Sequence, residues 1–228
     1  PIFNNITPIP IDQPTVTVTS PSNSQFVAGL VTVNGVVTDT AGPGTVNLIV
    51  DNVPGAAAIN YFSPSVSWDT RAIADGAHNI GFTVTNFVGL SGSSTSNVIV
   101  DNTGPIIPPP ISVYGSGSNL SSGYCNVNGS VLDTGSGPAG NITATVTRTG
   151  APSGSTFSAP IVNSNYSISF LGGNFCTVPT PQLGPCGTAT LLLTASDANG
   201  NTTSASYTLR TTITSLGARS VYTYSCGL

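Results

Sequence analysis

The sequence has very few charged residues, which make up 5% of the chain against about 25% in an average soluble protein. It contains no Lys, no Glu and no Met, and its basic residues are Arg71, Arg148, Arg210 and Arg219. Four separated Arg cannot neutralise a run of phosphates, so the composition argues against nucleic-acid binding and against a polybasic membrane contact. No apolar run approaches the ~18 residues that a membrane-spanning helix needs, and we therefore expect no membrane span.

The low charge does not predict disorder. Disordered chains combine low hydrophobicity with high net charge, whereas this chain is 39% hydrophobic with a formal net charge of −4. We expect a folded protein whose surface is wetted mainly by Ser, Thr, Asn and backbone groups, and which associates readily because few charges repel a neighbour. Because the chain begins with Pro1 and lacks Met, we expect a processed form or part of a longer product.

A helical signal is also missing, since no stretch shows a convincing 3.6-residue period. Short segments rich in β-branched residues alternate instead with Gly, Pro, Asn and Asp, which is typical of strands and turns. In the first half, the expected strands are 14–21, 30–37, 45–50, 65–70, 78–86 and 96–100. About seven strands in ~90 residues predict an antiparallel β-sandwich.

The second half of the chain repeats this pattern. "VNGVVTDT" at 33–40 returns as "VNGSVLDT" at 127–134, and the other segments return in the same order at 111–115, 141–149, 165–170, 187–200 and 204–212. The sequence therefore predicts an all-β protein of two tandem antiparallel sandwiches with extended terminal segments. The expected boundaries are an arm at 1–12, sandwiches at 13–104 and 111–214, a stiff Pro-rich linker at 105–110, and a tail at 215–228.

The motif series "PTVTVTSP…VNGVVTDTAG…SWDT…ADGAHNIGFTVT…VIVDNTGP" resembles the bacterial immunoglobulin-like domains found in tandem on surface and secreted proteins. The resemblance covers most of residues 13–104 and extends more loosely to the second copy, through "VNGSVLDTGSG" and "TASDANGNT". It implies immunoglobulin-like sandwiches, an extracellular or cell-surface location, and a spacer or adhesive role. It supplies no catalytic residue to transfer.

All four cysteines lie in the second half, and none has the spacing of a CxxC or Cys/His metal site. An even set of this kind predicts two disulfides formed in an oxidising compartment. Three pairings are possible. We favour Cys176–Cys186, which would close the loop "CTVPTPQLGPC", and Cys125–Cys226, which would tie the end of the chain to an early strand.

Candidates for chemistry are few, and we expect neither an enzyme nor a cofactor. His78, the single histidine, has no evident nucleophile or metal partner and is interpreted as structural. The Asp residues mostly adjoin turn residues, where they bond their own backbone; a Ca²⁺ site using Asp101 and carbonyl groups is the weaker alternative. Trp68 invites a sugar-stacking interpretation, but Phe170 occupies the equivalent position, so we expect an aromatic core position.

The two ends of the chain are more apolar than solvated tails need to be. The candidate assembly residues are Ile2, Phe3, Ile6, Ile9 and Ile11 at the N-terminus and Val221, Tyr222 and Tyr224 at the C-terminus. Because an extended arm can add a strand to a neighbour's sheet, we expect a homopolymer, namely a pilus-like surface filament assembled by strand donation. The alternative is an adhesin or spacer segment of a larger protein that binds a glycan or another surface ligand.

Overall fold

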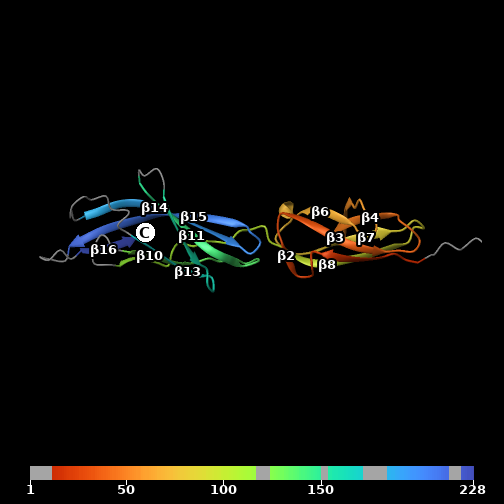
Figure 1. The fold of residues 1–228 in the computed structure, drawn as a ribbon, viewed down its shortest axis with the longest axis horizontal. Helices are drawn as coiled ribbons and strands as arrows, with labels where there is room; N and C mark the ends of the chain where they lie inside the picture. Colours follow the sequence, from red (N-terminus) through yellow and green to blue (C-terminus); the bar gives the residue numbers. More distant parts are fainter. Residues whose placement is uncertain (1–11, 117–123, 150–153, 172–183, 216–221) are drawn as a thin grey trace, which may run out of the picture. The chain divides into compact units, whose positions relative to one another are not determined.

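The computed structural model describes residues 12–116, 124–149, 154–171, 184–215 and 222–228. The chain divides into two compact units, which we call domain 1 (Pro1–Thr103) and domain 2 (Gly104–Leu228). Almost all regular structure is β-strand, with one short 3-10 helix, η1 (Thr70–Ala72), among the described residues (Figure 1). The all-β prediction is confirmed.

Domain 1 consists of two sheets. The smaller has the order β1-β3-β6 and the larger the order β2-β8-β7-β4-β5. All pairings are antiparallel except the short parallel pair of β2 with β8, in which Gln25 lies opposite Val98. The strands are β1 (Thr15–Ser20), β2 (Gln25–Val27), β3 (Leu30–Thr38), β4 (Thr45–Val50), β5 (Val53–Ala57), β6 (Ser65–Asp69), β7 (Gly76–Thr85) and β8 (Ser91–Val100).

Domain 2 repeats this arrangement except at one edge of the large sheet, where the C-terminal β16 pairs antiparallel with β15 in the place of the parallel β2. Its smaller sheet has the order β13-β10-β9 and its larger sheet the order β12-β11-β14-β15-β16. The strands are β9 (Ser112–Ser116), β10 (Tyr124–Ser130), β11 (Pro138–Arg148), β12 (Ser155–Pro160), β13 (Asn165–Leu171), β14 (Gly184–Asp197), β15 (Thr202–Ser215) and β16 (Tyr222–Gly227).

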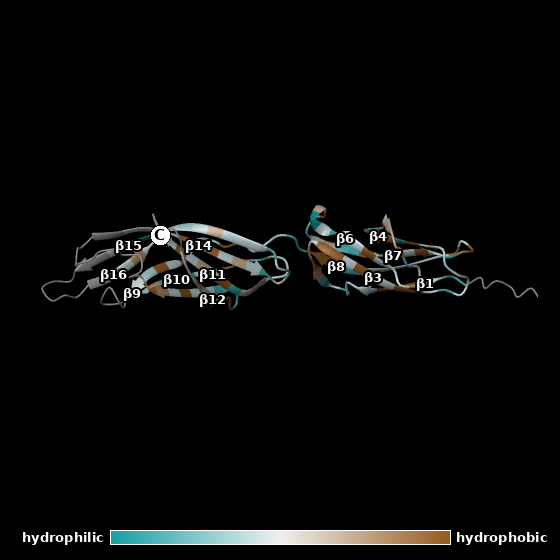
Figure 2. Ribbon diagram, turned by 45° about the horizontal axis from the view of Figure 1, so that its top comes forward, coloured by the Kyte–Doolittle hydropathy of each residue, from teal (hydrophilic) through white to brown (hydrophobic). Residues whose placement is uncertain are grey.

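Alternation along each strand creates the two cores. Successive side chains of a strand point to opposite faces, so apolar residues at every second position face the opposing sheet. Figure 2 shows this alternation as apolar and polar bands along the strands. Val33, Ile80, Phe82 and Val84 are completely buried in domain 1, and Ile142, Leu191 and Leu193 are completely buried in domain 2.

The duplicated aromatic position lies in the core of each domain. Trp68 on β6 and Phe170 on β13 occupy the edge strands of the corresponding small sheets, and they are 6% and 2% exposed. The interpretation of Trp68 as a core residue is therefore confirmed, since a buried ring offers no face to a sugar.

The segments predicted as linker and tail belong to domain 2. Within 105–110, Ile106 forms a bridge with Leu132, and Ile107 is buried in the domain 2 core, where its carbonyl accepts a hydrogen bond from the Tyr207 hydroxyl at 2.8 Å. Burial of Ile107 favours packing of this segment over a free spacer. Within the predicted tail 215–228, residues 222–227 form β16 of the large sheet.

Candidate assembly surfaces

His78 lies in a local hydrogen-bonded clamp. Its Nδ1 is 2.7 Å from Oδ2 of Asp51, and its Nε2 is 2.9 Å from the carbonyl oxygen of Ala74. The other oxygen of Asp51 accepts the backbone N–H of Asn79 at 2.9 Å. The hydrogen bond that the His78 ring donates to Asp51 raises the pKa of His78, and the same bond lowers the pKa of Asp51. Since both ring nitrogens are used, this arrangement fixes β7 against the β4–β5 turn and offers no base to a substrate.

The carboxylates of Asp69 and Asp75 also accept backbone N–H groups. Asp69 accepts the N–H of Arg71 and forms an exposed ion pair with its guanidinium at 2.7 Å, and these bonds hold the pKa of Asp69 at about 2. Asp75 accepts the N–H of Asn102 at 2.8 Å. Asp101, the candidate calcium ligand, is 2% exposed at the end of β8, and its N–H bonds the carbonyl of Val27. The turn interpretation holds for Asp69, which bonds the backbone two residues further on, whereas Asp75 bonds the backbone of a residue distant in sequence. The calcium site at Asp101 stays a prediction.

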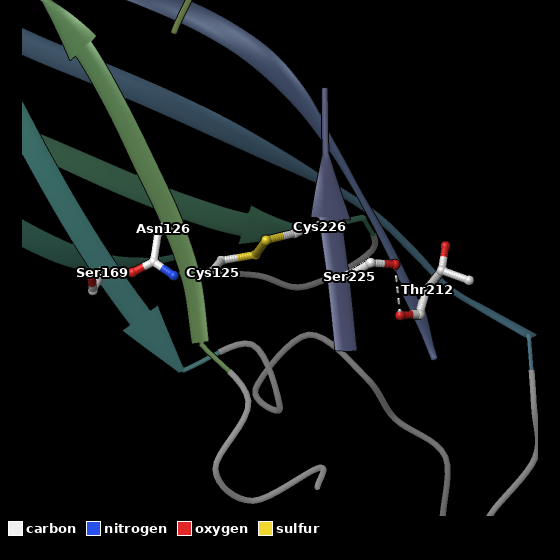
Figure 3. Close-up of a disulfide and its surroundings, with 6 residues drawn as sticks. All are labelled: Cys125, Asn126, Ser169, Thr212, Ser225 and Cys226. Carbon is white, nitrogen blue, oxygen red and sulfur yellow. Dashed lines mark hydrogen bonds between the residues drawn. A yellow bond between two sulfur atoms is a disulfide. The ribbon is translucent and has the colours of Figure 1, made fainter. Parts of the chain in front are cut away.

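A disulfide joins Cys125 of β10 to Cys226 of β16, with the two Cα atoms 5.9 Å apart (Figure 3). It connects the small sheet of domain 2 to the last strand of its large sheet and closes a sequence separation of 101 residues. Both cysteines are buried. Cys176 lies outside the described residues. Cys186 lies in β14, where the backbone alone is described.

The C-terminal assembly candidates lie in their own domain. Tyr222 and Tyr224 pair with Ser215 and Ile213 of β15, and Val221 lies outside the described residues. At the next residue pair, the Ser225 hydroxyl donates to the carbonyl of Thr212 at 3.3 Å (Figure 3). Donation of this strand to another molecule would require β16 to leave β15 and the disulfide to open.

The N-terminal candidates Ile2, Phe3, Ile6, Ile9 and Ile11 lie outside the described residues. The point at which this segment joins domain 1 is described: Asn86 donates to the carbonyl of Asp12 at 3.0 Å, Thr40 donates to its carboxylate at 3.0 Å, and Gln13 donates to the carbonyl of Ser91. Among the described residues, the strands of domain 1 begin at Thr15 and make up both of its sheets.

Each small sheet has two edge strands that are paired on one side alone among the described residues, β1 and β6 in domain 1 and β9 and β13 in domain 2. The strands β6 and β13 occupy equivalent positions. The β13 edge adjoins a cavity of about 320 Å³ lined by Pro160, Val162, Asn165, Tyr166 and Ser167. Sequence reasoning missed this edge as a site, although β13 ("NYSISFL") carries no charged residue that would protect it.

The comparisons with known proteins identify one family. Residues 14–81 match the model of the bacterial Ig domain family. The resemblance inferred from the sequence is therefore confirmed for this segment of domain 1. No curated protein sequence matches the chain. Among the described residues, none of the helical structure has the length and apolar character required to cross a bilayer.

Solved structures align with the chain at low sequence identity. A bacterial ice-binding adhesin of 1.5 MDa is 19% identical over 86% of this chain and 63% of the other, with a TM-score of 0.49. Fibronectin(III)-like modules from Clostridium thermocellum are 13% identical over 85% and 92% of the two chains, with a TM-score of 0.38. An endo-β-1,4-mannanase from Thermotoga petrophila is 18% identical over 41% of this chain, with a TM-score of 0.36, and the match spans 21% of that enzyme.

Proposed function

We propose that this protein is an extracellular structural protein, the subunit of a surface filament in which terminal strands are donated between Ig-like domains. The observation that supports this most directly is that the described strands, which begin at Thr15, make up both sheets of domain 1, whereas the C-terminal strand is retained by a disulfide. An apolar N-terminal segment is thereby the better donor of the two ends. An extended donor gains affinity from main-chain hydrogen bonds and specificity from alternate side chains.

The surface chemistry supports the same function. With 5% charged residues, the protein has few groups that would oppose close association of copies, and its sheet edges carry no Lys to guard them. The bacterial Ig domain match and the disulfide support a location outside the cytoplasm, where thiols oxidise and persist as cystine.

Electron microscopy and light scattering of the purified, oxidised chain test this function. We expect periodic fibres from the full chain and monomers from a chain that lacks residues 1–11, with unchanged thermal unfolding because Asp12 and its hydrogen bonds remain. If the shortened chain assembles like the full chain, donation by the N-terminus is wrong. A full chain that stays monodisperse would instead favour the spacer or adhesin alternative.

A further inference from the structure

The main-chain groups of β13 define an open pairing edge. The N–H of Val131 bonds the carbonyl of Ser164, and Asn165 exchanges both of its main-chain bonds with Val162 on the opposite side. Main-chain bonds of an antiparallel strand alternate in direction from residue to residue. The N–H and C=O groups of Ser167, Ser169 and Leu171 therefore point away from β10, toward the side on which no described strand lies.

The side chains of β13 alternate in step with its main chain. Tyr166, Ile168 and Phe170 are buried, whereas Ser167 and Ser169 are exposed. The cavity beside the edge is bounded by Pro160, Val162 and Tyr166, and Val162 is 58% exposed. The buried hydroxyl of Tyr166 has no hydrogen-bond partner among the described residues. An apolar side chain that approaches along this edge would thus find an apolar surface next to unpaired main-chain groups.

The equivalent edge in domain 1, that of β6, carries charged side chains. By the same alternation, since Gly35 donates to the carbonyl of Pro64, the main-chain groups of Ser67 and Asp69 on β6 point outward. This edge ends in the exposed Asp69–Arg71 ion pair and the η1 turn. Charged side chains on an edge discourage pairing with another strand, so the two edges differ in their availability.

The N-terminal sequence "TPIPI" (7–11) has the pattern of a strand that pairs on one side alone. In an extended chain the N–H groups of Ile9 and Ile11 point to one edge, and those of positions 8 and 10 point to the other. Both of the latter positions are Pro, which has no N–H. Such a strand donates from Ile9 and Ile11 and leaves an outer edge that cannot donate from Pro8 or Pro10 to a further strand.

The direction of pairing follows from the side chains. In a parallel pair, a residue that bonds the neighbouring strand lies opposite a residue that does not, and their side chains share a face. A parallel strand would bond Ile9 to Ser167 and Ser169 and place its side chain beside buried Ile168, with Ile11 beside Phe170. An antiparallel strand would turn both Ile side chains to solvent. Domain 1 already has a parallel edge strand, β2 beside β8.

We propose that the outer edge of β13 is the acceptor for residues 7–11 of a second copy of this chain, paired in the parallel direction. This assignment rests on the filament function proposed above. Because donor and acceptor belong to different domains, each copy would give a strand to one neighbour and receive one from another, which makes an open-ended assembly.

A proline on the acceptor edge tests the assignment. Ser169→Pro removes an outward N–H and no ladder bond to β10, so the domain should fold while assembly weakens at least about tenfold. Ser67→Pro is the matched control on β6 and should assemble as the unchanged chain does. The Ser169 hydroxyl also donates to Asn126 at 2.6 Å, and the proline variant loses this bond as well. Ser169→Ala removes the hydroxyl bond but keeps the outward main-chain N–H, so it should leave assembly intact. Ser169→Lys serves if the proline variant fails to fold.

Mixing completes the experiment. Just above the critical concentration of the unchanged chain, the donor-defective Ile9→Asp/Ile11→Asp chain and the acceptor-defective Ser169→Pro chain should each be monomeric. Mixed at that concentration, they should form 1:1 dimers and nothing larger by light scattering. Fibres from Ser169→Pro, or an equal loss in Ser67→Pro, would overturn the β13 assignment while the filament function stands. A full chain that never assembles would overturn both.

Discussion

At the residue scale, the His78–Asp51 contact makes the stability of domain 1 depend on pH. Asp51 raises the pKa of His78 above its usual 6.5, so the stabilisation is fully present below that value and is lost as the pH rises through the folded-state pKa. The pKa of Asp51 is lowered from 3.8, so its contribution is present above 3.8 and is lost as the pH falls through the folded-state pKa.

We therefore expect domain 1 to be more stable at about pH 5 than at about pH 8.5. The difference should be less than about 1 kcal/mol, because the Asp51 side chain is 48% exposed and water screens the pair. His78→Gln should remove the difference, as measured by thermal unfolding at both pH values. The chain has one histidine, so NMR titration of its ring reports the pKa directly; a value at or below 6.5 would contradict the prediction.

Removing the hydroxyl from each of two tyrosines of domain 2 should affect stability differently. Burial raises the pKa of Tyr166 to about 12, and its hydroxyl has no partner among the described residues. Tyr166→Phe should therefore leave stability unchanged or raise it by up to about 1 kcal/mol. Tyr207→Phe removes the bond to the Ile107 carbonyl and should lower stability by about 1 kcal/mol. Chemical denaturation measures both, and a greater loss in Tyr166→Phe would show that its hydroxyl is bonded.

At the element scale, the sequence predicts strands where packing and local preference agree. The alternation in 30–37 and 165–170 indicates β3 and β13 nearly residue for residue. The first half of β8, "SGSST", was missed because it has no apolar alternation and is held in place by pairing with β7. β5 ("VPGAA") was missed because it is exposed throughout and contains Pro and Gly, and β12 and β16 also depend on pairing with a longer neighbour.

The candidate site is less predictable for a physical reason. An available edge is the absence of a neighbouring strand, which no local pattern encodes. Trp68 and Phe170 were assignable because the two copies carry an aromatic residue at the same position. The terminal segments show the same limit: "SVYTYSC" alternates as any strand would, and the partner of residues 222–227 is fixed by β15 and by the Cys125–Cys226 disulfide.

The disulfide predicts a difference between the two domains. Domain 1 contains no cysteine, so Cys125→Ala/Cys226→Ala should lower the unfolding transition of domain 2 and leave that of domain 1 unchanged. Loss of a link across ~100 residues should cost about 2–5 kcal/mol, more than loss of the shorter Cys176–Cys186 loop predicted from the sequence. Calorimetry of this variant and of Cys176→Ala/Cys186→Ala checks which one loses more stability. Equal losses of unfolding free energy would argue against a role for loop length.

At the scale of the whole molecule, duplication and low charge act together. Each Ig-like sandwich folds around its own apolar core, and the polar side chains of the sequence are mainly hydroxyls and amides rather than ions. Ser, Thr and Asn side chains bond one another across strands, as in the pairs Thr85–Ser91 and Thr194–Ser204, each at 2.7 Å. Such a surface is wetted without long-range repulsion, which suits a protein whose proposed partner is another copy of itself.

Assembly should therefore depend little on ionic strength. Surface charges interact over about 10 Å at 0.1 M salt and about 3 Å at 1 M salt, but the proposed contact joins main-chain groups and Ile side chains. We expect the critical concentration for fibres to change less than about twofold between these conditions in NaCl, and to fall in sulfate, which strengthens apolar burial. Sedimentation at each salt concentration measures it. A steep fall in assembly with NaCl would instead mean that Arg and Asp side chains form the contact, because screening acts on charge and leaves hydrogen-bonded strands intact.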